Sequence, residues 1–507
     1  MLTSDFFESN LSSIGQRVRK CKRKESCKKI LILGGGFSGL RLAFLLNRKG
    51  YKVEIVERGD RLGGMVQTFS HTWNSREFLF DYGPHLFFDD YLPDYRELLG
   101  DDLIHIRDRF AMVTRGGMLS YPLRPIEMFT RMNPLRSAGY LLDFALWRLK
   151  GRRTAAGQSN LKTVMIERFG PKLFEDFYAP YIEKCCGLPS ERISPLWARE
   201  RENVSGKNPV DNIFKKVQSW FSRNTREQLA RGNHPSARDI LACYPRKGAG
   251  QLCDVMAETL PQESVHLGAE VKGVLTEGGL VQGLTVEQVG QNRTLRADLY
   301  ISTIPLQQFV CALTPVPGPE LLAAVSRLTY RTVRLVNLIV DQDRIFDCLE
   351  IFSMMRNHPF KRVYEPKAMS RELSPPGMSS LCMEVCCSEG DEFHTMPAGP
   401  LVDRCVDALL EMGLLASRDL VKDSFVVDMP NAYPVYTMGF EQDQQRLLEH
   451  VSGFGNLLTS GRQGLFRYHA MTNEVMEMVD SVARFLEGDR NKLLADNHRS
   501  RWGQSFY

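Results

Sequence analysis

The most regular alternation of apolar and polar segments in the chain lies near its N-terminus. An apolar run at 29–33 (KILIL) predicts a short buried strand, and the glycine-rich segment GGGFSG follows it at 34–39. Apolar residues then recur at helical spacing over 40–49, and a second apolar run at 52–56 predicts another strand. Strand, glycine turn, helix and strand within about 30 residues form the pattern of a βαβ unit.

The periodicity changes twice further along the chain. Residues 96–239 combine helical periodicity with aromatic and basic residues and few strand signals, whereas short apolar runs bounded by glycine turns dominate after residue 239. We expect helices at 125–149, 160–183, 210–231, 251–260, 401–412 and 473–486, and strands at 270–275, 280–288, 299–303, 333–341, 379–387 and 455–460.

This order predicts an α/β fold with two interleaved domains. A dinucleotide-binding domain, with a Rossmann-like βαβ unit and a β-meander, would consist of three separated stretches, and a mixed helical and sheet (α+β) substrate domain would be inserted in two pieces. The expected nucleotide-binding stretches are 29–95, 240–310 and 450–490; the substrate domain takes 96–239 and 311–449, and 1–28 and 491–507 are a basic leader and a tail.

Composition and charge narrow the class of protein. The 507 residues are 43% hydrophobic and 25% charged, which is typical of a globular protein. A net charge of +5 is too small for this length to indicate nucleic-acid binding. Much of the excess is local, because residues 17–29 hold eight Lys/Arg and one Glu. That segment is either a solvated leader or a patch that touches anionic lipid.

Cysteine usage and hydropathy suggest a cytoplasmic protein. The twelve cysteines show neither a C-x-x-C motif nor a zinc-site spacing, so we expect reduced thiols and no metal. We predict no signal peptide and no membrane-spanning segment. The segment 138–149 (AGYLLDFALWRL) is interpreted as an amphipathic helix, a pattern that more often packs on its own protein than on a membrane.

The glycine motif carries the most specific chemistry. Gly34 permits a tight turn, Gly36 lets the backbone approach a pyrophosphate, and Gly39 lets the helix pack on the strand. The helix N-terminus then presents its positive dipole end to the phosphates. Glu57, 18 residues past Gly39, is placed to accept hydrogen bonds from a ribose. A structural turn with an incidental glutamate is the alternative, which the complete strand–turn–helix–strand context disfavours.

A second pair of glycines follows directly after Glu57. GGGFSG at 34–39, followed by E-R-x-x-x-L-G-G at 57–64, resembles the FAD-binding amine oxidase superfamily, which includes monoamine oxidases, protoporphyrinogen oxidase, carotenoid desaturases and UDP-galactopyranose mutase. The resemblance implies bound FAD. It places near the cofactor Gly34, Gly36, Phe37, Ser38, Gly39, Glu57, Arg58, Arg61, Gly63, Gly64 and Met65.

Further segments resemble the same superfamily. D-Y-G-P-H-L-F at 81–87 looks like the stretch that runs along the flavin ring, which implies cofactor contacts from Gly83, Pro84 and His85. Y-P-R-K-G-A-G-Q-L at 244–252 resembles a helix entry beside the ring, and Val271 occupies the place of a backbone contact to the adenine. A strand ending in Gly461-Arg462 resembles the step that caps the ribityl and pyrophosphate.

The mutase-like branch shows the greatest resemblance. A-Y-P-V-Y at 432–436 and the stretches 360–365 and 386–392 look like that branch. However, 467–472 reads R-Y-H-A-M-T where the mutases carry R-Y-x-D-M-D, and 61–65 reads R-L-G-G-M in place of an H-I-G-G-N-like stretch. The missing acids count against mutase activity.

Three functions are compatible with these motifs. The first is an FAD-dependent oxidoreductase that moves a hydride from an organic substrate to flavin. The others are a mutase-like sugar isomerase and a non-catalytic binding protein of the same fold. Candidate catalytic or substrate-binding residues are His85, Arg334, Tyr433 and Tyr436, with Arg462 beside them. Arginine with tyrosine suits an anionic small molecule, including a sugar- or lipid-linked diphosphate, with peripheral membrane contact as a further expectation.

Overall fold

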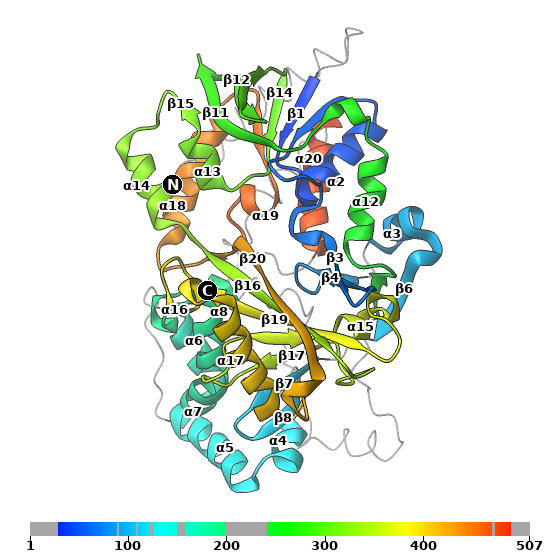
Figure 1. Cartoon of the computed structure of the whole chain (residues 1–507). Helices are drawn as coiled ribbons and strands as arrows, with labels where there is room; N and C mark the ends of the chain where they lie inside the picture. Colours follow the sequence, from blue (N-terminus) through cyan, green and yellow to red (C-terminus); the bar gives the residue numbers. More distant parts are fainter. Residues whose placement is uncertain are drawn as a thin grey trace, which may run out of the picture.

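A computed structural model describes residues 29–88, 91–107, 110–121, 123, 125–149, 159–198, 241–468 and 472–487 (Figure 1). The expected leader at 1–28, the expected helix at 210–231 and the tail at 491–507 lie outside the described residues. No helix in the described ranges is long and apolar enough to cross a membrane.

A five-stranded parallel sheet occupies the upper half of Figure 1. The predicted strands β1 (Lys29–Leu33) and β2 (Lys52–Val56) pair in it, and β14 (Leu299–Ser302) lies on the other side of β1. The order is β10-β2-β1-β14-β21, with β10 at Val265–His266 and β21 at Leu457–Thr459. Helices cover one face, and helices together with an antiparallel β-meander cover the other, so that both faces are buried as parallel sheets require.

The two faces of this sheet belong to two hydrophobic clusters. Ile30 and Ile32 pack with the helices α2 (Phe37–Arg48), α12 (Gly250–Glu258) and α20 (Thr472–Glu487). Leu31 and Leu33 point the other way, toward α13 (Leu306–Cys311) and α18 (Phe440–Ser452). Alternation of neighbouring side chains therefore sends one short apolar strand into both halves of the core.

The predicted β-meander is present beside this sheet. Strands β11 (Ala269–Glu277), β12 (Leu280–Gln288) and β13 (Gln291–Leu295) pair antiparallel in sequence order. Gly278 and Gly279 form the first turn with φ of +57° and +71°, a conformation that glycine adopts without strain.

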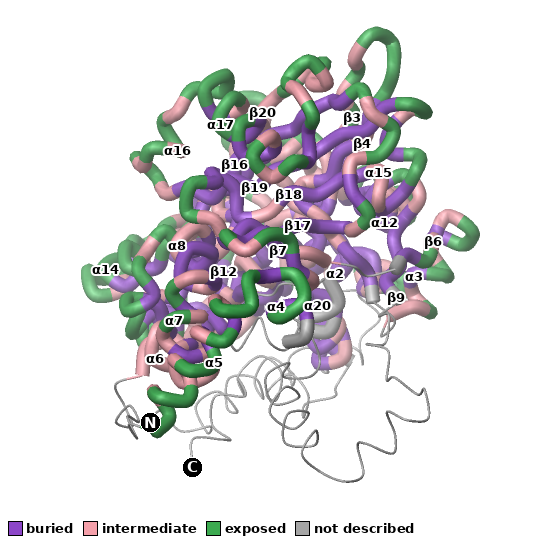
Figure 2. Tube along the Cα trace, turned by 90° about the horizontal axis from the view of Figure 1, so that it is seen from below, coloured by how far each residue is buried: buried purple, intermediate pink, exposed green. Residues whose placement is uncertain are grey.

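A seven-stranded sheet forms the core of the lower half of Figure 1. Its order is β20-β16-β19-β18-β17-β7-β8. The strands are β16 (Thr329–Val340), β17 (Glu350–Ser353), β18 (Arg362–Tyr364), β19 (Ser379–Cys387), β20 (Val421–Val435), β7 (Phe110–Thr114) and β8 (Gly117–Tyr121). Strand β19 is buried along its whole length, and Figure 2 shows β16 and β19 as buried tubes below the more exposed helix α17 (Ala398–Glu411).

The segment expected to be helical departs from prediction in two ways. Three strands occur where few were expected: β7, β8 and β6 (Leu103–Arg107), and β6 pairs with β9 (Leu241–Pro245) in a small sheet with β5 (Phe87–Phe88). Alternating runs of five residues were too short to dominate the helical periodicity around them.

The predicted long helices are also interrupted. The expected helix 125–149 is two helices, α4 (Pro125–Arg131) and α5 (Pro134–Leu149), because Pro134 starts a new helix. The expected helix 160–183 divides at Gly170 into α6 (Leu161–Phe169), α7 (Pro171–Leu173), a π-helical turn and α8 (Ala179–Cys186). Gly170 has φ +82° and is followed by proline, so the helix cannot continue.

Two of the expected domain boundaries do not coincide with breaks in the structure. Helix α3 (Leu92–Leu99) crosses the expected boundary at 95, and Leu99 of α3 and Leu103 of β6, beyond that boundary, join the cluster that covers α2. Helix α14 (Pro319–Arg327), beyond the expected boundary at 310, packs on α13, which begins before that boundary. A β-hairpin of β3 (Thr68–Trp73) and β4 (Arg76–Asp81) leads from the parallel sheet toward the seven-stranded one.

Candidate active site

The glycine turn between β1 and α2 leaves an open cradle. Gly34 has φ +99°, and a Cβ at Gly39 would overlap the Gly34 carbonyl oxygen, so neither position accepts another residue without distortion. Gly36 differs, because a Cβ there would meet nothing within 4 Å. No side chain caps α2 at Gly36. The first backbone N–H groups of a helix attract an anion, and here the backbone can be approached closely.

Glu57 is held next to this turn. Its Oε2 accepts the Gly35 N–H at 2.6 Å, and its Oε1 accepts the Gly59 N–H at 2.8 Å. Each carboxylate oxygen keeps a second lone pair, so these bonds orient the carboxylate and leave acceptor capacity for a hydroxyl. The expected position of Glu57 beside the glycine turn is therefore observed.

The second glycine pair runs directly against the first. The Gly63 N–H donates to the Gly35 carbonyl at 2.8 Å, and a Cβ on Gly64 would lie 2.9 Å from the Cα of Gly36. Both positions have positive φ, +112° and +58°. The chain after β2 thus returns to the rim of the cradle, where only glycine leaves room.

The other residues predicted to lie near the cofactor differ in their surroundings. Arg61 forms an ion pair with Asp254 of α12 at 2.8 Å and donates to the Thr68 carbonyl, so it ties together protein segments. Arg58 is exposed, and Met65 packs against the cluster that contains Val333. Val271 is a half-buried side chain in β11.

The carboxyl ends of β14 and β21 complete the crevice. Ser302 and Ser460 each bury a hydroxyl that has no hydrogen-bond partner in the part of the chain described. A Cβ at Gly461, the first residue of α19 (Gly461–Gly464), would come within 2.6 Å of the Ser38 Oγ at the start of α2. Ligands of open parallel sheets bind outside the carboxyl ends of the strands, which is where these groups gather.

A buried ionic cluster lies on the other side of the crevice, in the seven-stranded sheet. Arg362 of β18 donates through Nε to Glu384 Oε1 at 2.8 Å and pairs with Glu350 at 2.8 Å. Lys361 Nζ lies 2.7 Å from Glu384 Oε2. Burial alone would raise the pKa of Glu384, but Arg362 and Lys361 outweigh it and hold that pKa at about 2. We call Glu350, Lys361, Arg362 and Glu384 the ionic cluster.

Gly83 and His85 lie over this cluster. A Cβ at Gly83 would be 3.3 Å from Glu384 Oε1, so glycine lets the chain pass close to the carboxylate. Burial, and then the positive charge of Arg362, lower the pKa of His85 to about 4. The buried Nδ1 of His85 has no hydrogen-bond partner among the described residues. His85 is therefore a neutral imidazole near pH 7 with polar capacity unused.

Aromatic rings and arginine form the next wall. Tyr433 stacks on Tyr468 with ring centroids 5.3 Å apart. The Arg462 guanidinium lies 4.9 Å from the centroid of the Tyr433 ring. Lys361 Nζ, just before β18, lies 3.8 Å from the same centroid. Arg462 also donates to the Ala432 carbonyl at 2.6 Å, which fixes its orientation. The predicted Tyr433 and Arg462 thus come together with the ionic cluster.

Two other residues predicted to contact substrate form hydrogen bonds to protein groups instead. The Arg334 guanidinium binds Asp428 at 2.9 Å and the carbonyls of Phe393 and Met396, so its donors bind protein groups. Tyr436 is fully buried, and its hydroxyl accepts the Tyr468 N–H at 2.7 Å. These protein partners do not support the expectation that Arg334 and Tyr436 bind substrate directly. Side chains alternate between the two faces of a strand, so residues close in sequence can point to opposite sides of the sheet.

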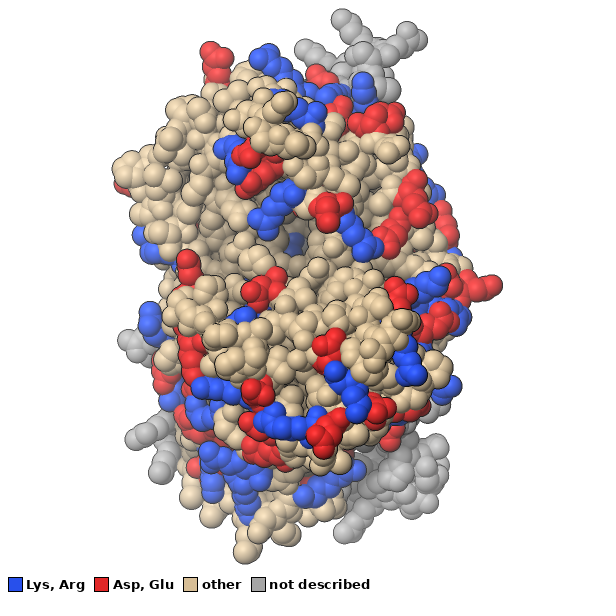
Figure 3. All heavy atoms as spheres, viewed as in Figure 1, with Lys and Arg blue, Asp and Glu red and all other residues tan. Residues whose placement is uncertain are grey.

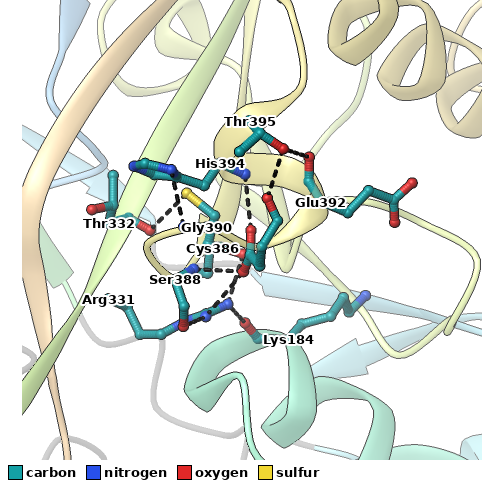
Figure 4. Close-up of polar contacts among 11 residues, drawn as sticks. Lys184, Arg331, Thr332, Cys386, Ser388, Gly390, Glu392, His394 and Thr395 are labelled. Atoms are coloured by element: carbon teal, nitrogen blue, oxygen red, sulfur yellow. Dashed lines mark hydrogen bonds and ion pairs between the residues drawn. The ribbon is translucent and has the colours of Figure 1, made fainter.

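Arg331 lies three residues before Arg334 on β16, and its side chain also binds other protein groups. Figure 4 shows its guanidinium between the loop after β19 and helix α8. It donates to Ser388 Oγ, to the Cys386 carbonyl at 2.8 Å and to the Lys184 carbonyl at 3.3 Å. Asp391, which accepts the His394 N–H at 2.8 Å, shapes that loop. Arg331 therefore joins the sheet to the helices below it.

The residues that sequence reasoning missed are those of the ionic cluster. Lys361 and Arg362 lie in the stretch 360–365 that resembles the mutase-like branch, yet nothing in the sequence indicates that Lys361 would be buried and Arg362 half-buried. Glu384 lies in a continuously buried strand, which was an available signal, since a buried carboxylate requires partners.

The parallel sheet, the open glycine turn and Glu57 define a dinucleotide-binding protein with a second sheet closing over the cofactor crevice. A match to the flavin containing amine oxidoreductase family spans residues 37–462. The chain belongs to this family.

Individual relatives are distant. The chain is 21% identical over 304 residues to protoporphyrinogen oxidase 2 of Arabidopsis thaliana, covering 55% of this chain and 58% of that protein. The solved structure of reduced UDP-galactopyranose mutase matches 93% of this chain and 98% of its own, with a TM-score of 0.76 at 19% identity. Cyclohexylamine oxidase from Brevibacterium oxydans matches 91% and 99%, with a TM-score of 0.63 at 14% identity. These structures establish the fold.

The curated relatives extend beyond the matched region. The chain spans 58% of the Arabidopsis protein and 46% of an L-amino-acid oxidase from Bothrops jararacussu, to which it is 26% identical over 239 residues.

FAD, the cofactor that the family implies, fits the residues present. The open space at Gly36 suits a pyrophosphate, and Glu57 has acceptor capacity for a ribose. The hydroxyls of Ser302 and Ser460 and the Nδ1 of His85 have no hydrogen-bond partner among the residues described, so a ligand is expected to supply one.

Proposed function

We propose that this protein is an FAD-dependent oxidoreductase that removes a hydride from an organic substrate. Membership of a flavin containing oxidoreductase family over residues 37–462 carries this proposal. When bound, FAD supplies the hydride acceptor. The residues of the chain bind the cofactor, orient the substrate and set the charge around both.

The cofactor-binding assignments follow the crevice. Gly34, Gly36, Gly39 and Glu57 would hold the adenosine diphosphate half, because the turn is open only at Gly36. Gly63, Gly64, Gly461 and Arg462 would line the passage toward the ring. Gly83, Pro84 and His85 would lie along the ring, on the ionic cluster that supports them.

The ionic cluster would serve as a rigid support. Its four charges cancel, and each carboxylate is paired with a cation within 2.8 Å. A buried network that is fully paired keeps a fixed geometry, which a hydride transfer needs for alignment of donor and acceptor atoms. Because its pKa is about 4, His85 would stay neutral near pH 7 and would add no charge beside the ring.

The substrate is proposed to be an anionic small molecule. Arg462 lies with Tyr433 and Tyr468 at the crevice, and arginine beside aromatic hydroxyls suits a phosphate or carboxylate. Figure 3 shows the molecule hollowed between its two halves, with both Lys/Arg and Asp/Glu atoms around the hollow. A substrate linked to a sugar or a lipid is compatible with this hollow. A cytoplasmic location with peripheral membrane contact completes the proposal.

A redox-neutral sugar isomerisation is the second candidate. The TM-score of 0.76 to reduced UDP-galactopyranose mutase and the A-Y-P-V-Y stretch at 432–436 favour it. The absence of both acids after Tyr468, in the sequence 467–472, opposes it.

Anaerobic mixing separates these functions. The purified flavoprotein would be mixed with representative amines, amino acids, porphyrinogens, nucleotide sugars and polyprenyl-linked sugars while the visible flavin band is followed. An oxidoreductase loses the band with its substrate and regains it in air. Turnover of a nucleotide sugar only after chemical reduction of the flavin, with no acceptor consumed, would replace our proposal by the isomerase. A folded protein that binds no flavin would refute both.

A further inference from the structure

Helix α5 is inverted relative to an ordinary surface helix. Its buried side carries Ser137 and Tyr140, whereas leucines face solvent. Ser137 Oγ donates to the Met128 carbonyl, and the Tyr140 hydroxyl donates to Asp176 at 2.6 Å. An ordinary surface helix buries its apolar stripe and exposes its polar one, so this arrangement needs a partner for the outer face.

Leucine and alanine dominate the exposed face of α5, which also carries Pro134 and Arg148. Leu135 and Leu149 are 83% and 82% exposed, and Leu142 is 61% exposed. At 100° per residue the exposed leucines and alanines fall within an arc of roughly 140°. They are Leu135, Ala138, Leu141, Leu142, Ala145, Leu146 and Leu149. We call these seven residues the leucine face.

Neighbouring elements extend the leucine face and add positive charge. Phe129 of α4 is 41% exposed and Met118 of β8 is 37% exposed. A Cβ at Gly116 would meet the Met132 side chain, so the β7–β8 turn lies against the link from α4 to α5. Arg115, Arg131 and Arg148 of these elements are exposed.

The acidic residues of the same helices are used internally. Glu127 accepts from both the backbone N–H and the hydroxyl of Ser120, each at 2.7 Å. Asp143 accepts the Lys172 N–H at 2.8 Å. The exposed Arg115, Arg131 and Arg148 outnumber Asp143, the one carboxylate of α4 and α5 that is not buried. The charge around the leucine face is therefore positive, which complements anionic lipid headgroups.

We propose that α4 and α5 dock this protein on an anionic membrane surface, with the leucine face inserted at the boundary between headgroups and acyl chains. The helix lies at the lower extremity of the molecule in Figure 1, so a flat surface can reach it without meeting the other half. A stable protein–protein interface needs about 20–30 residues from each partner, far more than this single stripe offers, which disfavours a second copy of the chain as its occupant. An interfacial helix needs only an apolar face and flanking cations.

Vesicle flotation with the full-length flavoprotein tests this proposal without measuring turnover. Wild type is expected to float with vesicles of phosphatidylcholine and phosphatidylserine, and much less with phosphatidylcholine alone. Leu142→Glu with Leu146→Glu is expected to lower the bound fraction by about tenfold, because two charges enter the apolar stripe. The matched control is Val289→Glu with Val316→Glu, two residues that are 95% and 73% exposed in the other half of the molecule. This control is expected to float like wild type.

Three outcomes would overturn the proposal. If the wild-type protein does not float with the anionic vesicles, it has no membrane-docking surface. If Leu142→Glu with Leu146→Glu floats as well as wild type, another segment, such as the basic run at 17–29, makes the contact. A wild-type dimer that the same variant converts to a monomer, without vesicle binding, assigns the face to a second copy. Flavin content equal to wild type verifies that each variant is folded.

Discussion

Arg362 and Glu384 lie opposite each other on adjacent strands, and Nε of the first is 2.8 Å from Oε1 of the second. Glu384 and Lys361 are buried and Arg362 is half-buried, and the Glu384 carboxylate lies next to Gly83. This pair links the stability of the seven-stranded sheet to the shape of the crevice. It is also the part of the site that sequence reasoning did not find.

Glu384→Gln is expected to lower the free energy of unfolding by about 3–5 kcal/mol, because it leaves buried cations without their counter-charge. Urea unfolding followed by tryptophan fluorescence measures this. Glu392→Gln is the matched control, since Glu392 pairs with Arg404 on the surface, where 62% and 51% of the two side chains are exposed. We expect the control to stay within about 0.5 kcal/mol of wild type. Equal losses in both variants would contradict the role of burial.

The same carboxylate predicts an acid dependence of stability. Its pKa falls from an ordinary 4.5 to about 2 in the folded protein. A depressed pKa stabilises the fold above pH 4.5, and that contribution is lost as the pH falls toward 2. The difference corresponds to about 3 kcal/mol. The gap in unfolding free energy between wild type and Glu384→Gln should therefore narrow over this interval. A constant gap would show that Glu384 does not titrate there.

Gly36 and Gly39 are expected to respond differently to the same substitution. Gly36→Ala places its methyl group in open space, so the fold should survive while flavin affinity falls about tenfold or more. Gly39→Ala would overlap the Gly34 carbonyl, so folding itself should suffer. Thermal unfolding of the flavin-free proteins and flavin fluorescence titration separate the two effects. Normal flavin affinity in Gly36→Ala would move the pyrophosphate away from this turn.

Glu57→Arg should abolish flavin retention, because a cation replaces the acceptor beside the ribose position and the bonds to Gly35 and Gly59 are lost. Glu57→Gln keeps one acceptor oxygen and should retain part of the flavin. The ratio of visible to ultraviolet absorbance of the purified proteins reports both. Wild-type flavin content in Glu57→Arg would refute the placement of the adenosine.

His85 should not appear in the pH profile of flavin reduction between pH 5.5 and 8. Burial and Arg362 lower its pKa to about 4, so its neutral form persists throughout that range. Rapid mixing of a substrate with wild type and with His85→Asn, at a series of pH values, should give parallel profiles. A limb near pH 6–7 that disappears in His85→Asn would show that the imidazole ionises during the reaction.

Local sequence determined the nucleotide-binding part of this protein. The strands at 29–33 and 52–56, the glycine turn between them and the position of Glu57 follow from periodicity and from the space that each glycine leaves, and these properties act over a few neighbouring residues. The meander at 269–295 could be predicted for the same reason, because glycine turns join its consecutive strands.

The tertiary structure alone decided the chemistry of the opposite wall. Lys361, Arg362 and Glu384 acquire their properties from strand pairing between segments about 20 residues apart, and His85 joins them from a distant part of the chain. Arg334 and Tyr433 look equally suitable as sequence, yet the pleat directs Arg334 to Asp428 and Tyr433 to the crevice. Burial and long-range pairing set the pKa and the free donors of a side chain, and neither quantity is encoded in the residues beside it.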